Sequence, residues 1–225
     1  IIVRAGAVNV DPDSQSGGLQ IPALNGVNGF NGNAELSGTG VEVDDDTQLG
    51  LTATYMFSNS LGIELLAATP FTHDITADLG GLGQVNAGEA TQLPPTLSAV
   101  WYPLGSDSTV SPYVGAGLNY TIFLEDSVSS ELEAGLSGVA NAVTGTNVGL
   151  PSPMDLGLEL DDSWGVAAQV GVDFALNDNW HINASVRWID INTEAEITSG
   201  DTTIIKIDDI EIDPWVYQLN IGYKF

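Results

Sequence analysis

The sequence contains no cysteine and very little positive charge. The absence of cysteine excludes disulfide bonds, thiolate metal ligands and thiol catalysis. Lysine and arginine together number 4, against 30 aspartate and glutamate residues, which gives a formal net charge of −26. Because nucleic-acid-binding surfaces are basic, this balance argues against a nucleic-acid partner.

Long apolar runs are also missing. No segment approaches the roughly 18 consecutive apolar residues that a transmembrane helix requires. The first residues, Ile1–Gly6, have the character of a strand and show no signal-peptide pattern, so we expect a cytosolic protein or a processed form without its targeting segment. Even so, 43% of the 225 residues are hydrophobic, with 5 Trp, 6 Tyr and 6 Phe, which favours an ordered structure over disorder.

The dominant pattern is strict two-residue alternation. Apolar residues occupy every second position, with small or polar residues between them, in the segments 49–57, 114–122, 164–174, 180–188 and 215–225. Such alternation predicts β-strands with one apolar face. Since the apolar faces end in aromatic residues and the other faces are polar, the pattern is typical of a transmembrane β-barrel with its apolar surface toward lipid. The alternative is a soluble sandwich or lipocalin-like barrel, in which the apolar face points inward.

Turn sequences divide the chain into eight predicted strands. Short polar turns lie at 58–60, 104–108 and 177–179, and longer connections lie at 11–40, 79–87, 128–158 and 199–203. The strands between them cover approximately 1–10, 41–57, 61–78, 88–103, 112–127, 160–176, 180–198 and 204–225. We therefore predict a single all-β domain over residues 1–225, an eight-stranded antiparallel transmembrane barrel with both termini at the short-turn end. Several strands exceed the length needed to span a bilayer, so the barrel should extend beyond the outer leaflet.

Acidic residues gather toward the long loops. Clusters occur at Asp44–Asp46, at 155–162 and at 208–213. One interpretation is a divalent-cation site at the rim, since carboxylate oxygens suit Ca²⁺ and Mg²⁺. The other is a solvated acidic collar, which agrees with the lack of EF-hand spacing, and we predict no metal site. A helical turn is expected within one long loop, at 129–140.

A second set of charged residues is placed inside the barrel by strand parity. These residues lie near the short-turn end and comprise Arg4, Glu64, Asp173, His181 and Lys224. Buried charges need partners, so we predict a hydrogen-bonded charged floor on the periplasmic side. No enzymatic activity is expected. His181 and Ser185 are about 13 Å apart along a strand, too far for a hydrogen-bonded pair, and the adjacent His73 and Asp74 face opposite ways.

Three prolines interrupt two neighbouring predicted strands. Pro94 and Pro95 are consecutive, and a hairpin centred near 81–83 puts Pro70 of the preceding strand about opposite Pro95. Proline removes a hydrogen bond from the strand ladder, and unpaired backbone groups are costly in lipid. We therefore predict a lateral opening formed by Pro70, Pro94 and Pro95, with simple strand kinking for barrel curvature as the alternative.

Several segments resemble the OmpW family of outer-membrane proteins. They are Thr47–Met56, Glu64–Phe71, Leu93–Leu97, Pro112–Tyr120, Asp162–Gly165, Gln169–Asp173 and Asp213–Trp215. The C-terminal Phe225, with Tyr223 two residues before it, also looks like the signal that barrel-assembly machinery recognises. The resemblance implies an integral protein of the Gram-negative outer membrane.

The resemblance also implies a narrow hydrophobic channel with a leucine and a tryptophan at its constriction. By motif these residues correspond to Leu66 and Trp164. Leu66 agrees with strand parity, which places it inside. Trp164 has the parity of lipid-facing residues, so either a bulge near Gly165 turns it inward or it belongs to the outer aromatic girdle.

The interior of an eight-stranded barrel is nearly filled by side chains, which excludes a wide water-filled porin. We predict a passive channel for small hydrophobic molecules with lateral exit through the barrel wall into the membrane, and no cofactor. The alternative is a structural or receptor-type surface barrel with acidic loops and a filled lumen. An apolar cavity open at the loop end would favour transport. Expected partners are outer-membrane lipid and lipopolysaccharide, small apolar solutes and the barrel-assembly machinery.

Overall fold

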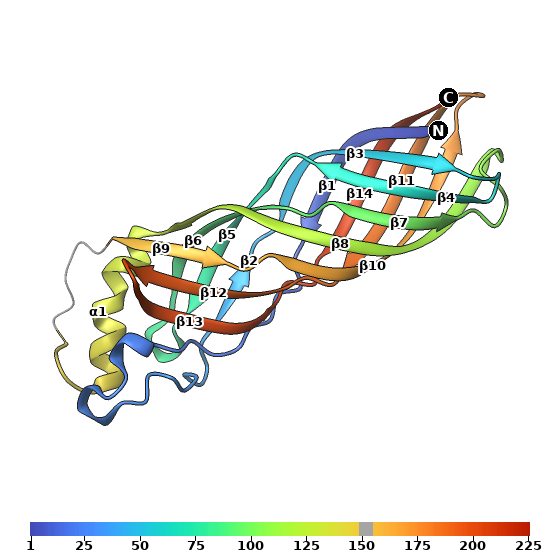
Figure 1. Ribbon diagram of the computed structural model, residues 1–225. Helices are drawn as coiled ribbons and strands as arrows, with labels where there is room; N and C mark the ends of the chain where they lie inside the picture. The colour runs from blue at the N-terminus through green and yellow to red at the C-terminus, as the bar shows by residue number, and fades with distance from the viewer. Residues whose placement is uncertain (149–154) are drawn as a thin grey trace.

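The computed structural model describes residues 1–148 and 155–225, which form an elongated molecule built mainly from strands. Eight antiparallel strands close into a barrel through the pairing of β8 with β10. They are β1 (Ile2–Asp11), β3 (Asp46–Met56), β4 (Leu61–Ala68), β7 (Thr96–Trp101), β8 (Val110–Val128), β10 (Ser163–Ala175), β11 (Trp180–Ile189) and β14 (Trp215–Lys224). Figure 1 shows both termini together at one end, as predicted.

The barrel carries its apolar side chains outside. Leu118 and Leu219 are 60% and 62% exposed, whereas the next residues along the strands, Asn119 and Asn220, are buried. An apolar exterior around a polar interior is the arrangement of a membrane barrel, so the predicted fold class is confirmed and the inverted soluble barrel is excluded. No helix in the described part of the chain is both long and apolar enough to cross a bilayer.

Beyond the membrane barrel the wall continues as two further sheets. On one side β2 (Gly40–Val43), β5 (Phe71–Asp78) and β6 (Gln84–Leu93) pair in sequence and join the outer part of β8. On the other side β9 (Leu156–Leu160), β12 (Asn192–Ser199) and β13 (Thr202–Glu211) form a separate sheet. Both sheets lie at the end away from the termini, and we call this part the outer half (Figure 1).

The prediction of long continuous strands is therefore wrong for five of them. Each is two strands separated by a break, in the predicted segments 41–57, 61–78, 88–103, 180–198 and 204–225. The segment 160–176 corresponds to β10, and β9 lies mainly in the predicted connection 128–158, where no strand is expected. Proline accounts for three breaks, through Pro70, the pair Pro94 and Pro95, and Pro214, because proline cannot donate to a ladder. By contrast β8 continues through this level for 19 residues.

At the level of the strand breaks, the side chains that face the inside of the barrel change from polar to mainly apolar. Along β11 and β12 every second side chain is buried, beginning with His181, Asn183, Ser185 and Arg187 and continuing with Ile189, Ile191, Thr193, Ala195 and Ile197. The inside is thus polar where lipid surrounds the barrel and mainly apolar where water surrounds it. In the outer half the hydrophobic effect acts inward, as in a soluble protein.

The loop end is closed by a helix and a long connection. Helix α1 (Ser130–Thr144) starts at Ser129, whose hydroxyl accepts from the amide of Leu132 at 3.1 Å, and it ends at the left-handed Gly145. This confirms the helical turn expected at 129–140 and extends it. Leu136 packs into the apolar cluster of the outer half together with Leu24 from the connection before β2. That connection contains the 3₁₀ turns η1 (Pro22–Leu24) and η2 (Val27–Gly29), and η3 (Gly80–Leu82) joins β5 to β6.

Candidate functional site

An apolar cavity of about 60 Å³, the outer cavity, lies inside the outer half. Strands of both further sheets and β8 form its walls, and typical lining residues are Ile75, Phe123, Leu158, Ile205 and Ile207. Within the described chain its lining includes no Asp, Glu, Lys or Arg. Three lining side chains are polar, those of His73, Gln92 and Thr193. The chemistry of the cavity suits small apolar molecules.

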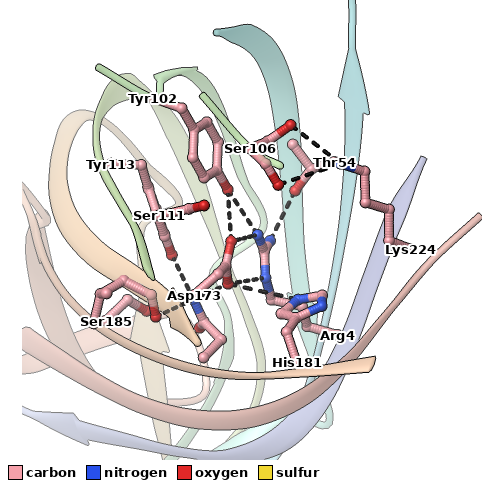
Figure 2. Close-up of polar contacts among 12 residues, drawn as sticks. Arg4, Thr54, Tyr102, Ser106, Ser111, Tyr113, Asp173, His181, Ser185 and Lys224 are labelled. Carbon is pink, nitrogen blue, oxygen red and sulfur yellow. Dashed lines mark hydrogen bonds and ion pairs between the residues drawn. The ribbon is translucent and has the colours of Figure 1, made fainter. Parts of the chain in front are cut away.

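Between the outer cavity and the chain termini, a buried ion network centred on Arg4 lies inside the membrane barrel (Figure 2). The Arg4 guanidinium donates to Glu64 and Thr54, each at 2.9 Å, and binds both oxygens of Asp173 at 3.1 and 2.7 Å. The Tyr102 hydroxyl accepts from Arg4 at 2.7 Å and donates to Asp173 at 3.1 Å. Two-pronged charge-assisted bonds of this kind are strong and hold their partners in a fixed geometry.

A second arginine, Arg187, extends the network toward the outer half. Its guanidinium donates to Glu64 at 3.0 Å and to the side-chain oxygen of Gln169, whose amide also donates to Glu64 at 3.0 Å. Glu64 thus bridges Arg4 and Arg187, and all three are only 1% exposed. We call the set Arg4, Thr54, Glu64, Tyr102, Gln169, Asp173 and Arg187 the polar plug. Arg187 was not among the residues predicted for the floor, although its alternation with His181 and Ser185 signals an inward position.

The other two predicted floor residues lie at the short-turn mouth. His181 Nε2 is 3.5 Å from Asp173 and packs against Gly222, where an added Cβ would stand 2.1 Å from that nitrogen. Lys224 donates to the Ser106 carbonyl at 3.2 Å and pairs with the turn residue Asp107. His181 therefore contacts the plug, whereas Lys224 fastens a turn at the barrel's edge.

The pairing of the third and fourth predicted strands is interrupted between the cavity and the plug. The ladder ends at Leu66 opposite Thr96 and resumes at Phe71 opposite Gln92. Residues 67–70 therefore face 93–95 outside the regular ladder, and we call this the wall gap. Pro70 is exposed, Pro94 is buried and Pro95 is half-buried.

The register at the wall gap differs slightly from the predicted one. Phe71 opposite Gln92 puts Pro70 opposite Leu93, two residues from Pro95, because the hairpin turns at Gly80–Leu82, earlier than predicted, and the irregularity between Ile75 and Thr76 offsets only one residue of the difference. On its other side the proline pair is bridged to β8, since the amide of Tyr120 and the side chain of Asn119 donate to Pro95 O at 3.1 and 3.2 Å. Residues 94–95 thus lie outside the ladder with β8 as well, but on that side hydrogen bonds bridge the interruption.

The two predicted constriction residues have different positions. Leu66 is 4% exposed, inside the barrel at the lower edge of the wall gap. Trp164 is 72% exposed and stacks on Tyr120 with ring centroids 4.4 Å apart. The assignment of Trp164 to the constriction is wrong, because β8 and β10 pair through Gly165 without a register shift and the side chain keeps its outward parity.

The acidic rim shows local pairing rather than a metal cage. Among the described residues, no group of three or more His, Cys, Asp or Glu side chains is placed to hold a metal ion. Asp46 instead accepts from Gln48 and from the amides of Thr47 and Thr72.

Asp126, in the outer part of β8, gives the rim a pH dependence. Burial raises the pKa of this carboxyl to about 6, although the Thr91 backbone donates to it. A carboxyl whose pKa rises on folding favours the folded state at low pH, and this contribution is lost as the pH increases from about 4 to about 6. Replacing Asp126 by Asn should therefore raise the melting temperature more at pH 8 than at pH 4.

Thermal unfolding in detergent at the two pH values measures this effect. The exposed Asp74, replaced by Asn, is the control, because both variants remove one negative charge from the outer half. Equal gains at both pH values for Asp126→Asn would contradict the assignment.

Comparison with known proteins places this geometry among outer-membrane barrels. The model of the OmpW family matches residues 1–225. Outer membrane protein W of Vibrio cholerae serotype O1 is 42% identical over 225 residues, covering 100% of this chain and 88% of the relative. The crystal structure of OprG from Pseudomonas aeruginosa superposes with a TM-score of 0.81 at 36% identity, covering 100% of this chain and 94% of that one. The dibenzothiophene metabolism operon protein PahQ of Pseudomonas aeruginosa is 23% identical over 188 residues, covering 84% of this chain and 76% of the relative.

Proposed function

Because the chain belongs to the OmpW family and is an integral outer-membrane barrel, we propose that it is a passive channel for small hydrophobic molecules, which leave sideways through the barrel wall. The observation that carries the proposal is the order of three features along the barrel axis. The apolar outer cavity lies toward the loop end, the polar plug lies toward the termini, and the wall gap lies between them. Transport of this kind needs no catalytic step and no cofactor.

The polar plug supports a sideways route over a straight one. An apolar solute moving down the axis would have to separate Glu64 from Arg4 and Arg187, at 2.9 and 3.0 Å, in a site shielded from water. Breaking a buried ion pair leaves uncompensated charge and is strongly unfavourable. The wall gap has no such barrier, because its ladder hydrogen bonds are already missing.

The height of the wall gap supports an exit into the outer leaflet. Pro95 is bonded to the amide of Tyr120, and the ring of Tyr120 stacks on Trp164 at the outer aromatic margin of the barrel. Aromatic girdles of membrane barrels lie at the boundary between hydrocarbon and head groups. A solute that passes between residues 67–70 and 93–95 would therefore enter the lipid directly.

Leu66 and the barrel surface have further proposed roles. Leu66 closes the bore beneath the wall gap and directs a solute sideways rather than toward Glu64. Outer-membrane lipid and lipopolysaccharide would surround the exposed apolar band, and the barrel-assembly machinery would recognise Tyr223 and Phe225, whose rings contact each other at 4.8 Å. The name of the relative PahQ links it to dibenzothiophene metabolism, which agrees with an apolar solute class.

A structural or receptor-type barrel is the second candidate. It is favoured by the packing of α1 and the connection before β2 over the loop end and by the small volume of the outer cavity, about 60 Å³. If the protein is a structural or receptor-type barrel, a side chain that fills the outer cavity would leave uptake of apolar molecules unchanged.

Replacing Ala195 by Phe tests the choice between the two. Ala195 lines the outer cavity, so a phenyl ring there should block it and bring uptake of an apolar fluorophore into lipopolysaccharide-containing vesicles close to the protein-free rate. The matched control is Glu194→Phe, on the same strand with its side chain exposed. Unchanged uptake by a correctly folded Ala195→Phe protein would support the structural role instead.

A further inference from the structure

We infer that the outer cavity selects apolar solutes bearing one hydrogen-bond donor, such as a hydroxyl or an N–H group, and that the side-chain oxygen of Gln92 accepts this bond. The inference rests on the proposed function and names the solute class within it. A chain of hydrogen bonds links the backbone carbonyl of Asp44 to His73 and His73 to Gln92.

The contact with Asp44 fixes the tautomer of His73. His73 Nδ1 is 2.7 Å from the Asp44 carbonyl oxygen, which accepts hydrogen bonds and cannot donate them. The proton therefore lies on Nδ1, and in a neutral ring Nε2 is left as an acceptor. Gln92 Nε2 is 2.9 Å from His73 Nε2, so this amide nitrogen is the donor.

The surroundings of His73 keep its ring neutral and in place. The side chain is 2% exposed, and burial lowers its pKa even though the carboxylates of Asp44, Asp45 and Asp46 act in the opposite direction. Phe71 stacks beside it at an interplanar angle of 21°, with ring centroids 6.2 Å apart. A fixed, neutral His73 in turn fixes the amide orientation of Gln92.

This orientation leaves one acceptor unused. Gln92 is 1% exposed, and its Oε1 has no hydrogen-bond partner among the described residues. The other polar lining residue, Thr193, already donates its hydroxyl proton to the Asp161 carbonyl at 2.7 Å. Gln92 Oε1 is thus an unpaired acceptor in a mainly apolar wall.

Gln92 also stands where a solute would have to pass. It lines the outer cavity and pairs with Phe71 in the first ladder position above the wall gap. An alcohol, a phenol or an indole-like N–H would satisfy Oε1, whereas a hydrocarbon or an ether would leave it unpaired. Sites built to bond one polar group discriminate against analogues that lack it. A charged solute is disfavoured by the apolar lining.

Binding of two isomers to the protein in lipid nanodiscs tests the inference. The probes are 1-hexanol and 1-methoxypentane, which have the same atoms but differ in the donor, titrated while the methyl signals of Ile197 and Ile205 are followed by NMR. For the double variant His73→Phe with Gln92→Leu, the preference for the alcohol should fall about tenfold relative to wild type, while the ether still binds. Replacing both partners by apolar groups keeps the cavity filled and leaves no unpaired group between these two positions, while the Asp44 carbonyl that loses its bond to His73 belongs to an exposed residue.

Two further variants serve as controls. Thr193→Val removes the polar group that is already paired and should leave the preference unchanged. His73→Phe alone frees the Gln92 amide protons, which should improve ether binding and narrow the preference. The same alcohol-to-ether ratio in wild type and the double variant, with both probes bound, would overturn the inference and leave the proposed function intact. Binding of neither probe to the wild-type protein would overturn both.

Discussion

Replacing Arg4 by methionine is expected to lower the free energy of unfolding by about 3–5 kcal/mol. Methionine approximates the length of the side chain but leaves Asp173 without its two-pronged partner and Glu64 with one arginine instead of two. Both carboxylates remain inside the barrel, where an uncompensated charge is strongly unfavourable. Urea unfolding in detergent micelles, followed by tryptophan fluorescence, measures the loss.

The partly exposed ion cluster around Lys206 provides the control. Lys206 Nζ lies 3.1 Å from Glu194 and 3.0 Å from Asp208 on the surface of the outer half. Because exposed pairs gain little from their attraction in water, Lys206→Met should cost only a small part of what Arg4→Met costs. Adding Asp173→Asn to Arg4→Met should recover part of the stability, since the two changes act on one network. Equal losses for the two methionine variants would contradict the account of the plug.

The membrane barrel follows from the sequence because one local rule governs it. Alternation with a period of two, with aromatic residues at its ends, defines both the lipid face and the inner face. That rule puts Arg4, Glu64 and Asp173 on the inner face, where buried charges need partners, and it puts Arg187 there as well. The same rule puts Leu66 inside and Trp164 outside, and the structure follows parity where the family resemblance pointed the other way for Trp164.

The outer half is harder to predict because the same line of strands passes from lipid into water. The inner face of β11 and β12 is polar up to Arg187 and apolar from Ile189, and the switch marks where lipid gives way to water outside. Proline signals the strand breaks at Pro70 and Pro214, whereas the breaks at 44–45 and 161–162 each fall on a pair of aspartates, which strands disfavour only weakly. The contact between His73 and Gln92 depends in turn on the register of β5 and β6, which the turn at Gly80–Leu82 and the one-residue irregularity after Ile75 determine together.

The central claim is that solutes leave through the wall gap, and cross-linking the gap tests it. The natural sequence has no cysteine, so a pair of introduced cysteines is unique. Thr69→Cys and Leu93→Cys place one thiol on each side of the gap and retain all three prolines. The matched control is Thr72→Cys with Thr91→Cys, which are direct cross-strand partners in the intact ladder of the same two strands.

The measurement is the protein-dependent rate at which an apolar fluorophore enters lipopolysaccharide-containing vesicles, with a reducible thiol cross-linker in place and again after reduction. We predict that cross-linked Thr69→Cys/Leu93→Cys protein falls to the protein-free rate and recovers on reduction, while the Thr72→Cys/Thr91→Cys protein is unaffected. Uptake that continues unchanged with the Thr69→Cys/Leu93→Cys cross-link closed would contradict lateral exit.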